Sequence, residues 1–388
     1  MASRAAAIGL LAIIALAVLA GDDEPDPAVI ARHVEDLGSD IFQDREDAMR
    51  ALRKFGDDAI PFLRKRATSD DLEMRRRESD LLADIEMRGQ MQTFNGHDKG
   101  VIALALLPGD RQLLSGSEDT TIRLWNVADG TLARRFEGHT KQVWTLALSP
   151  DGKTFASGGQ DRTARLWTLA ADTPARELAS FADGVRCLLF SKDGNRLLVG
   201  ALDEKIHVVD VKEGKVVRAW KGHLDAVLCM ALSPDGKTIG SGGGCKDQSI
   251  CVRDAGSGEV RKRLAGHAEH VCAVAFVDNE HIVSAGYDNI VRLWDIGTGK
   301  VERTFTGHQE RVYGLAVSAD GRRILTGAYD RQIRLWDLRT GEEIRRFQQH
   351  DDGINALAFT SNGRHALSAS NDATVRMWYL PRVLKVRP

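Results

Sequence analysis

Six sets of His, Ser or Thr, and Asp recur along the chain, and these residue types could together perform nucleophilic catalysis. His97, Ser115 and Asp119 form the first set, and in a hydrolase an aspartate orients a histidine that removes the proton of a serine hydroxyl. The equivalent sets are His139, Ser157 and Asp161; His223, Ser241 and Asp247; His267, Ser284 and Asp288; His308, Thr326 and Asp330; and His350, Ser368 and Asp372. Catalysis needs one site, so the repetition favours a structural role for all six sets.

A tryptophan follows the aspartate by six residues in five of the sets: Trp125, Trp167, Trp294, Trp336 and Trp378. A buried polar group without a partner costs about 1–3 kcal/mol, so a complete hydrogen-bonded network would fix the same turn in each unit. The fourth unit has Arg253 at the Trp position, and the third keeps Asp203 but has Phe181 at the His position. Histidines on separate units cannot converge on one ion, so we expect no metal site.

The elements that position these residues repeat with the same period. Gly-His pairs or their variants begin at residues 96, 138, 180, 222, 266, 307 and 349, so the intervals are 41 to 44 residues. Each period reads as an apolar strand, a tight turn such as Asp151-Gly152, a second strand, an Asp and a third strand. This pattern predicts a four-stranded antiparallel meander in each of seven units.

The repeated residues resemble the WD-repeat (WD40) family. The first period contains GH, SGSED and TIRLWN, the sixth contains GH, TGAYD and RQIRLWD, and the likeness covers residues 91–388. The resemblance implies an all-β, seven-bladed β-propeller over residues 89–388, closed by a strand at about 89–94. It also implies that each Asp accepts a hydrogen bond from the His, while the Ser or Thr hydroxyl bonds both the His and the indole N–H.

The residues before the propeller divide into three predicted segments. Residues 1–20 carry one cation, Arg4, and an apolar run over 5–20, which predicts a signal peptide cut after Ala20 or an uncleaved anchor that tethers the chain to a membrane. Residues 21–26 read as an acidic linker. We therefore expect export to a periplasmic, extracytoplasmic or membrane-tethered location, with the cytoplasm as the alternative.

Residues 27–88 show apolar side chains three and four positions apart, which predicts four short helices. Their pattern resembles the HEAT-like class of helical repeats. The expected fold is thus a small all-α helical-hairpin unit followed by the propeller.

Composition and missing motifs narrow the classes of function. A net charge of −2 with 28% charged residues gives no field for nucleic acid phosphates. The sequence has no glycine-rich phosphate loop and no HExxH or CxxC motif, so we expect no enzyme and no cofactor. Its five cysteines, an odd number, are expected to be packed core thiols, with at least one unpaired.

The features that differ between units are the candidates for recognition. The resemblance implies that loop positions beside each repeat Asp and each inner strand contact partners. Three of the four tyrosines fall there, and the candidate partner-binding residues are Trp144, His270, Tyr287, Arg311, Tyr313 and Tyr329. We expect a monomeric, non-enzymatic scaffold that binds polypeptides, similar to multi-domain WD-repeat proteins of bacteria. The alternative is a propeller enzyme or a small-molecule or glycan receptor that uses the central channel.

Overall fold

The computed structural model describes residues 26–55, 59, 62–63, 72–87, 90–170 and 175–380. The chain forms two compact units, Met1–Met87 and Arg88–Pro388. The predicted signal peptide or anchor lies outside the described residues, as does the acidic linker apart from Asp26.

The first unit contains the helices α1 (Pro27–Asp36), α2 (Phe42–Phe55) and α4 (Leu72–Met87). Asp26 starts α1, because its side chain accepts a hydrogen bond from the Ala28 N–H at 2.9 Å and Pro27 needs no such partner. Ile30, Leu37 and Leu52 are fully buried in the core of this unit. The predicted helical unit is therefore present, although its expected third helix falls mainly on residues outside the described ranges.

Within the described part of the chain, no helix combines the length and the apolar character needed to cross a membrane.

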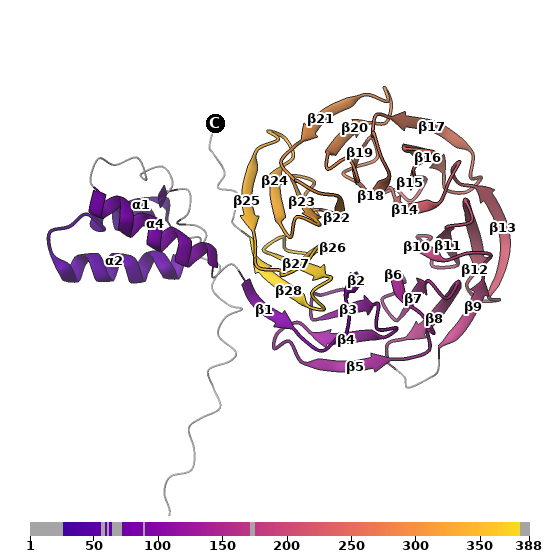
Figure 1. Cartoon of the computed structure of the whole chain (residues 1–388), viewed down its shortest axis with the longest axis horizontal. Coiled ribbons are helices and arrows are strands. Elements are labelled where there is room, and N and C mark those ends of the chain that lie inside the picture. The colour runs from indigo at the N-terminus through magenta and orange to yellow at the C-terminus, as the bar shows by residue number, and fades with distance from the viewer. Residues whose placement is uncertain are drawn as a thin grey trace, which may run out of the picture. The chain divides into compact units, whose positions relative to one another are not determined.

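The second unit is a ring of seven four-stranded antiparallel sheets, which confirms the predicted seven-bladed propeller (Figure 1). The innermost strands are β2 (Val101–Leu106), β6 (Val143–Leu148), β10 (Val185–Phe190), β14 (Val227–Leu232), β18 (Val271–Phe276), β22 (Val312–Val317) and β26 (Ile354–Phe359). The second strands are β3 (Gln112–Ser117), β7 (Thr154–Gly159), β11 (Arg196–Ala201), β15 (Thr238–Gly243), β19 (His281–Gly286), β23 (Arg323–Ala328) and β27 (His365–Ser370). The third strands are β4 (Ile122–Asn126), β8 (Thr163–Thr168), β12 (Lys205–Asp210), β16 (Ser249–Asp254), β20 (Val291–Asp295), β24 (Ile333–Asp337) and β28 (Val375–Tyr379). The outer strands are β5 (Leu132–Phe136), β9 (Arg176–Ser180), β13 (Lys215–Lys221), β17 (Val260–Ala265), β21 (Val301–Phe305), β25 (Glu343–Phe347) and β1 (Gln90–Phe94).

The ring closes through a strand from the start of the propeller. β1 pairs antiparallel with β28, with Phe94 opposite Val375, and so completes the sheet formed by β26, β27 and β28. Pairing the two ends of the propeller in one sheet joins the first and last blades and leaves no gap in the ring.

The cores lie between neighbouring blades. An aromatic residue of one outer strand packs against the repeat Trp of the next blade, with ring centroids 5.6 Å apart for Phe136 and Trp167 and 5.3 Å apart for Phe347 and Trp378. Tilted or edge-on pairs at this separation are favourable for aromatic rings. The repeat tryptophans therefore join blades together as well as completing the polar network.

Candidate functional site

The first repeated set forms one continuous hydrogen-bonded chain. The His97 Nδ1–H donates to Asp119 at 2.7 Å, the Ser115 hydroxyl meets His97 Nε2 at 2.7 Å, and the Trp125 indole N–H donates to Ser115 at 2.8 Å. Because an indole nitrogen can only donate, the Ser115 proton is available to Nε2, which fits a neutral imidazole protonated on Nδ1.

The same geometry recurs around the ring. The His Nδ1 atom lies 2.7–3.0 Å from its Asp in the pairs that begin at His139, His223, His267, His308 and His350. The second ring nitrogen lies 2.6–2.8 Å from Ser157, Ser241, Ser284, Thr326 and Ser368. The indoles of Trp167, Trp294, Trp336 and Trp378 donate to their hydroxyls at 2.7–2.8 Å.

Five of the six network aspartates also hold a strained turn, and Asp247 is the exception. The residue after Asp119, Thr120, has a φ of 72°, a left-handed conformation that non-glycine residues rarely adopt. Asp119 Oδ1 accepts the N–H of Thr121 at 2.9 Å, while Oδ2 accepts the N–H of Asp98 at 3.1 Å in the loop that carries His97. One carboxylate therefore fixes the turn between the second and third strands and attaches it to the neighbouring loop.

Burial excludes these sets as working nucleophiles. The hydroxyl residues, Ser115 and its five equivalents, are all 0% exposed, and their histidines are 1–7% exposed. A hydrolytic serine must meet its substrate, whereas Ser115 is enclosed by the His97 ring and the Trp125 indole. The geometry resembles that of a catalytic triad, but the accessibility does not.

In the third unit, the repeat aspartate bonds a histidine from a different sequence position. His207, on β12, lies at the strand position that carries Arg in five other units, and its Nε2 lies 2.9 Å from Asp203. Phe181 occupies the place of the missing histidine, and its ring centroid lies 4.9 Å from that of His207. The sequence analysis did not predict the pairing of His207 with Asp203. A His at a position that carries Arg in five other units was the signal for it.

In the fourth unit, the arginine that pairs with the repeat aspartate comes from a different strand. Cys251 occupies the position of the usual Arg, and Arg263 on the outer strand β17 pairs with Asp247 at 3.1 Å instead. Arg253, at the Trp position, is 2% exposed and donates to the Gly222 carbonyl. The buried Arg253 guanidinium therefore occupies the space that the indole fills in other units. It does not form the bond to the Ser241 hydroxyl that an indole would form.

Burial and hydrogen bonding set the charges of the network. Burial lowers the pKa of His223 to about 4, against the opposing effect of Asp247, so this imidazole is neutral near pH 7. Burial acts to raise the pKa of Asp288, but the hydrogen bonds and charges of His267 and Arg292 together outweigh it and the pKa falls to about 2. Asp119, Asp161 and Asp372 have pKa values shifted in the same direction, because the paired histidines and the hydrogen bonds from nearby threonines together outweigh burial.

These shifts predict that the propeller loses stability as the pH falls. The folded state binds a proton at His223 less readily than the unfolded chain, so stability present above pH 6.5 is lost as the pH falls through about 4. The aspartates act in the same direction, because Asp288 contributes stability above pH 3.8 that is lost towards pH 2. Urea unfolding at pH 7, 5.5 and 4 should give progressively lower midpoints. Equal midpoints would contradict the lowered pKa values of His223 and the network aspartates.

Two groups of described side chains have the residue types of a metal site. The first is His223, Asp247 and Cys251, where the Asp already binds His223 and Arg263. The second is His281, Asp295 and Glu302. Burial acts to lower the pKa of His281, but the hydrogen bond with Asp278 and the negative charges of the nearby carboxylates together raise it. The raised pKa favours an imidazolium that pairs with carboxylates rather than a metal ligand.

Five of the six predicted partner-binding residues lie together on the fifth and sixth blades. His270 stacks on Tyr287 with centroids 4.5 Å apart and planes at 4°, Tyr287 meets Tyr313 at 5.4 Å, and Tyr313 meets Tyr329 at 4.9 Å. The Arg311 guanidinium lies 4.3 Å from the Tyr287 ring centroid. We call His270, Tyr287, Arg311, Tyr313 and Tyr329 the aromatic cluster.

Backbone pairing fixes the aromatic cluster at one end of the sheets. The Tyr287 N–H donates to the His270 carbonyl and the Tyr329 N–H donates to the Arg311 carbonyl, both at 3.0 Å. Arg311 is exposed and the four rings are partly exposed, so the cluster reaches solvent. Burial and the contact with the Tyr287 hydroxyl raise the pKa of Tyr313, so its phenol stays protonated.

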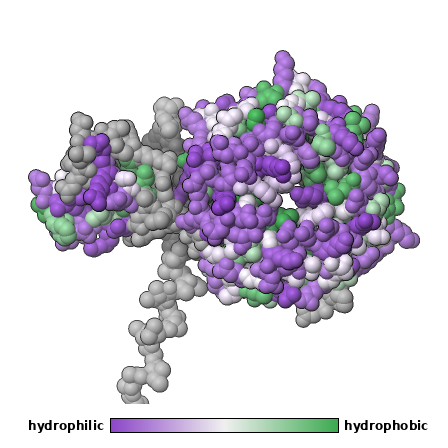
Figure 2. Space-filling model, viewed as in Figure 1, coloured by the Kyte–Doolittle hydropathy of each residue, from purple (hydrophilic) through white to green (hydrophobic). Residues whose placement is uncertain are grey.

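Trp144, the sixth predicted residue, does not join the cluster. It lies on β6 and its indole donates to Gln142 at 2.9 Å. Trp144 and Tyr313 nevertheless line the same central cavity of about 250 Å³, which the innermost strands surround. The surface around the channel is mostly hydrophilic with scattered apolar residues, as Figure 2 shows for one face.

The channel thiols lack the character of nucleophiles. Cys187, Cys229 and Cys272 line the central cavity, and burial raises the pKa of Cys187 and of Cys272 to about 12. Since the thiolate is the reactive form, these groups are inert near neutral pH. The expectation of five core thiols was wrong for Cys245, which is exposed in the longer turn of the fourth unit.

Comparison with known families places the chain among WD-repeat proteins. The profile of the WD domain, G-beta repeat, matches residues 88–126, 130–168, 258–295, 299–337 and 341–379. A second profile, the Anaphase-promoting complex subunit 4 WD40 domain, matches residues 163–235. The chain therefore belongs to the WD40 repeat family.

Individual relatives are similar over limited lengths. A segment of 52 residues is 44% identical to WD repeat and HMG-box DNA-binding protein 1 of Mus musculus, covering 13% of this chain and 5% of that protein. A segment of 50 residues is 44% identical to Autophagy-related protein 16 of Arabidopsis thaliana, covering 12% and 10% of the two chains. The WD40 β-propeller domain of Doa1 superposes with a TM-score of 0.66 at 25% identity, over 75% of this chain and 96% of that domain.

Proposed function

We propose that the protein is a non-enzymatic interaction scaffold that binds a polypeptide on the loop end of the fifth and sixth blades. The aromatic cluster carries this proposal, because it joins three tyrosines, a histidine and an arginine in one partly exposed surface. Tyr and Arg supply large contact areas at low entropic cost and dominate the energetics of many interfaces. Proteins of the WD40 family typically act as interaction scaffolds, which supports the same class of function.

The contacts within the cluster also favour a preformed surface. Ring stacking and the Arg311 contact hold the side chains before a partner arrives, so less conformational entropy is lost on binding. The repeated polar sets cannot supply a competing site, since their hydroxyls are buried and bonded on both sides.

A selection experiment separates a polypeptide partner from a small-molecule or glycan ligand. A random-peptide display library is selected on the wild-type chain and counter-selected on the Tyr313→Ala/Tyr329→Ala variant, and the same two proteins are applied to a glycan array. We expect peptides that bind the wild type and not the variant. Cluster-dependent binding to glycans, with no such peptides, would contradict the proposal.

We also propose that the chain is exported, on the basis of the apolar run over residues 5–20 and the single cation before it. N-terminal sequencing of the protein purified from its native cells should find a chain that begins at Gly21. A mature chain that begins with the first residues of the sequence and is recovered in the soluble cytoplasmic fraction would contradict export.

A further inference from the structure

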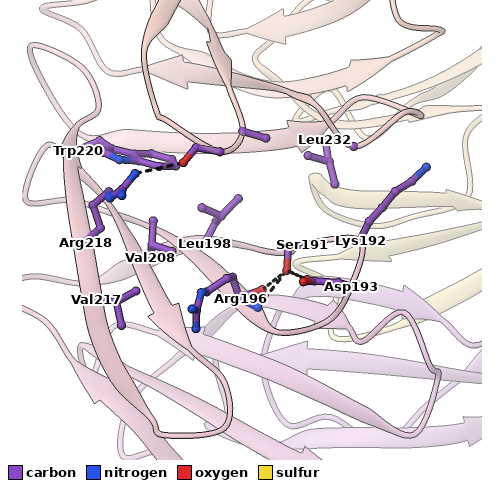
Figure 3. A pocket seen from close by; sticks show the side chains of 13 residues that line it. Ser191, Lys192, Asp193, Arg196, Leu198, Val208, Val217, Arg218, Trp220 and Leu232 are labelled. Atoms are coloured by element: carbon purple, nitrogen blue, oxygen red, sulfur yellow. Dashed lines mark hydrogen bonds between the residues drawn. The ribbon is translucent and has the colours of Figure 1, made fainter.

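A cavity of about 570 Å³ lies between the third and fourth blades, at the end of the sheets opposite the aromatic cluster (Figure 3). Its walls are formed by β11, β12 and β13 of the third blade and by the hairpin turns next to Leu232 and Ala255 of the fourth. The turns between the first and second strands and between the third and fourth strands meet at this end. The volume is typical of sites that hold a small organic ligand.

The cavity lies where this interface departs from the repeat. At the corresponding outer-strand position, the other six blades carry a buried residue: Phe94, Phe136, Leu178, Leu264, Phe305 and Phe347. The third blade has Trp220 there, which is only partly buried and lines the cavity. The repeat Trp that should pack against it is replaced by Arg253, so the usual aromatic pair between blades is missing and space remains.

Apolar side chains form the inner wall. Leu198 and Val208 are 4% and 9% exposed, and Leu232 faces them across the cavity with Trp220 at one side, as Figure 3 shows. The Trp220 indole N–H is buried and has no acceptor in the described structure, in contrast to the five repeat indoles. No hydrogen bond fixes the Trp220 ring, so this wall can adjust to a ligand.

The lining of the cavity includes three cations, Lys192, Arg196 and Arg218. Lys192 and Arg218 are exposed lining residues without a salt bridge to a described side chain. The charge of Lys192 acts on the Asp235 carboxylate, whereas Arg218 donates only to the Gly256 carbonyl, at 3.2 Å, among the described residues. Arg196 is paired with Asp210. The one acidic lining residue, Asp193, has both oxygens occupied within its own turn, by Ser191 and Asn195.

We propose that this cavity binds a small anionic amphiphile, an aliphatic or aromatic body with one carboxylate. The body would lie against Leu198, Val208 and Trp220, where burying apolar area is favourable. The carboxylate would lie at the Arg218 end of the rim, beside Trp220, where charge-assisted hydrogen bonds are available. The site is independent of the polypeptide-binding surface proposed above.

Three probes with the same ten-carbon chain test the chemistry of the ligand. Decanoate, decanol and decyltrimethylammonium are titrated into the full chain by calorimetry, below the concentrations at which they form micelles. Decanoate should bind at one site about tenfold more tightly than decanol, the effect of one charge-assisted bond. Absence of saturable decanoate binding, or equal affinity for decanoate and the ammonium probe, would overturn the proposal.

Two matched glycine substitutions test the location. Gly256 lines the cavity, and a Cβ added there meets only Asp254 Oδ1, at 3.4 Å, so Gly256→Phe should block the cavity without strain. Gly297 has the same turn position in the fifth blade, where a Cβ meets only Asp295 Oδ1, at 3.3 Å. Gly256→Phe should weaken decanoate binding at least tenfold while Gly297→Phe leaves it unchanged, and equal losses would contradict this location.

A second variant keeps the test decisive if Gly256→Phe does not fold. Lys192→Gln/Arg218→Gln changes two exposed side chains and leaves the apolar wall intact. It should weaken decanoate binding about tenfold and leave decanol binding unchanged. Decanoate affinity that stays at the wild-type value would exclude the rim as the carboxylate site.

Discussion

Replacing Tyr313 and Tyr329 together by Ala will weaken capture of the selected peptide partner by about 10- to 100-fold, a loss of about 1.4–2.8 kcal/mol of binding free energy. The two rings pack on each other at 4.9 Å, and Tyr313 also supports Tyr287, so the double variant removes the middle and one end of the cluster. Affinity is measured by calorimetry with a peptide from the display selection.

A matched substitution distinguishes recognition from general damage. Tyr379 is the remaining tyrosine of the chain and ends β28, outside the aromatic cluster. Tyr379→Ala should leave the affinity for the peptide unchanged. If both variants lost affinity equally, or if the double variant bound as tightly as the wild type, the aromatic cluster would not be the partner site.

Asp330→Asn will reduce the free energy of unfolding by about 2 kcal/mol, because charged hydrogen bonds in a buried network are lost. Asp330 accepts from His308 Nδ1 at 2.9 Å and from the N–H groups of Gln309 and Gln332 at 3.0 Å. It therefore ties the loop that precedes the sixth blade to the turn within that blade. An asparagine amide would present donors where the aspartate has acceptors.

Asp203→Asn is the matched control in the third unit and should cost less than about 1 kcal/mol. Asp203 bonds His207 and the N–H of Lys205, both within four residues of it, so it joins no separate loop to the blade. Urea unfolding of both variants gives the two free energies. Equal losses would show that the continuous network of the other units contributes nothing beyond a local contact.

The fold could be predicted from the sequence because every unit repeats the same short-range signals. Turn dipeptides such as Asp151-Gly152 mark the hairpins, and the period of the Gly-His pairs counts the blades. The positions of the network residues follow from that period, and the resemblance to the WD-repeat family implied the pairing of His97 with Asp119 that the structure shows.

The exchanges between strands could not be predicted in the same way. His207 serves Asp203, and Arg263 reaches Asp247 from a neighbouring strand, since register and side-chain direction decide which residue fills a vacant position. Sequence position made Trp144 a candidate for partner binding, and the structure places it on β6, apart from the aromatic cluster. The cavity beside Trp220 depends on packing between two blades, which no periodic pattern encodes.

The most direct test measures stability and peptide affinity on the same two proteins, Asp119→Asn and Tyr313→Ala/Tyr329→Ala. Asp119 lies in the first blade, away from the aromatic cluster, and accepts bonds from His97 and Thr121. The first variant should unfold at lower urea while its peptide affinity stays at the wild-type value, and the second should lose affinity with its urea midpoint unchanged. If Asp119→Asn abolished peptide binding at full stability, the repeated polar groups would be functional rather than structural, contrary to this account.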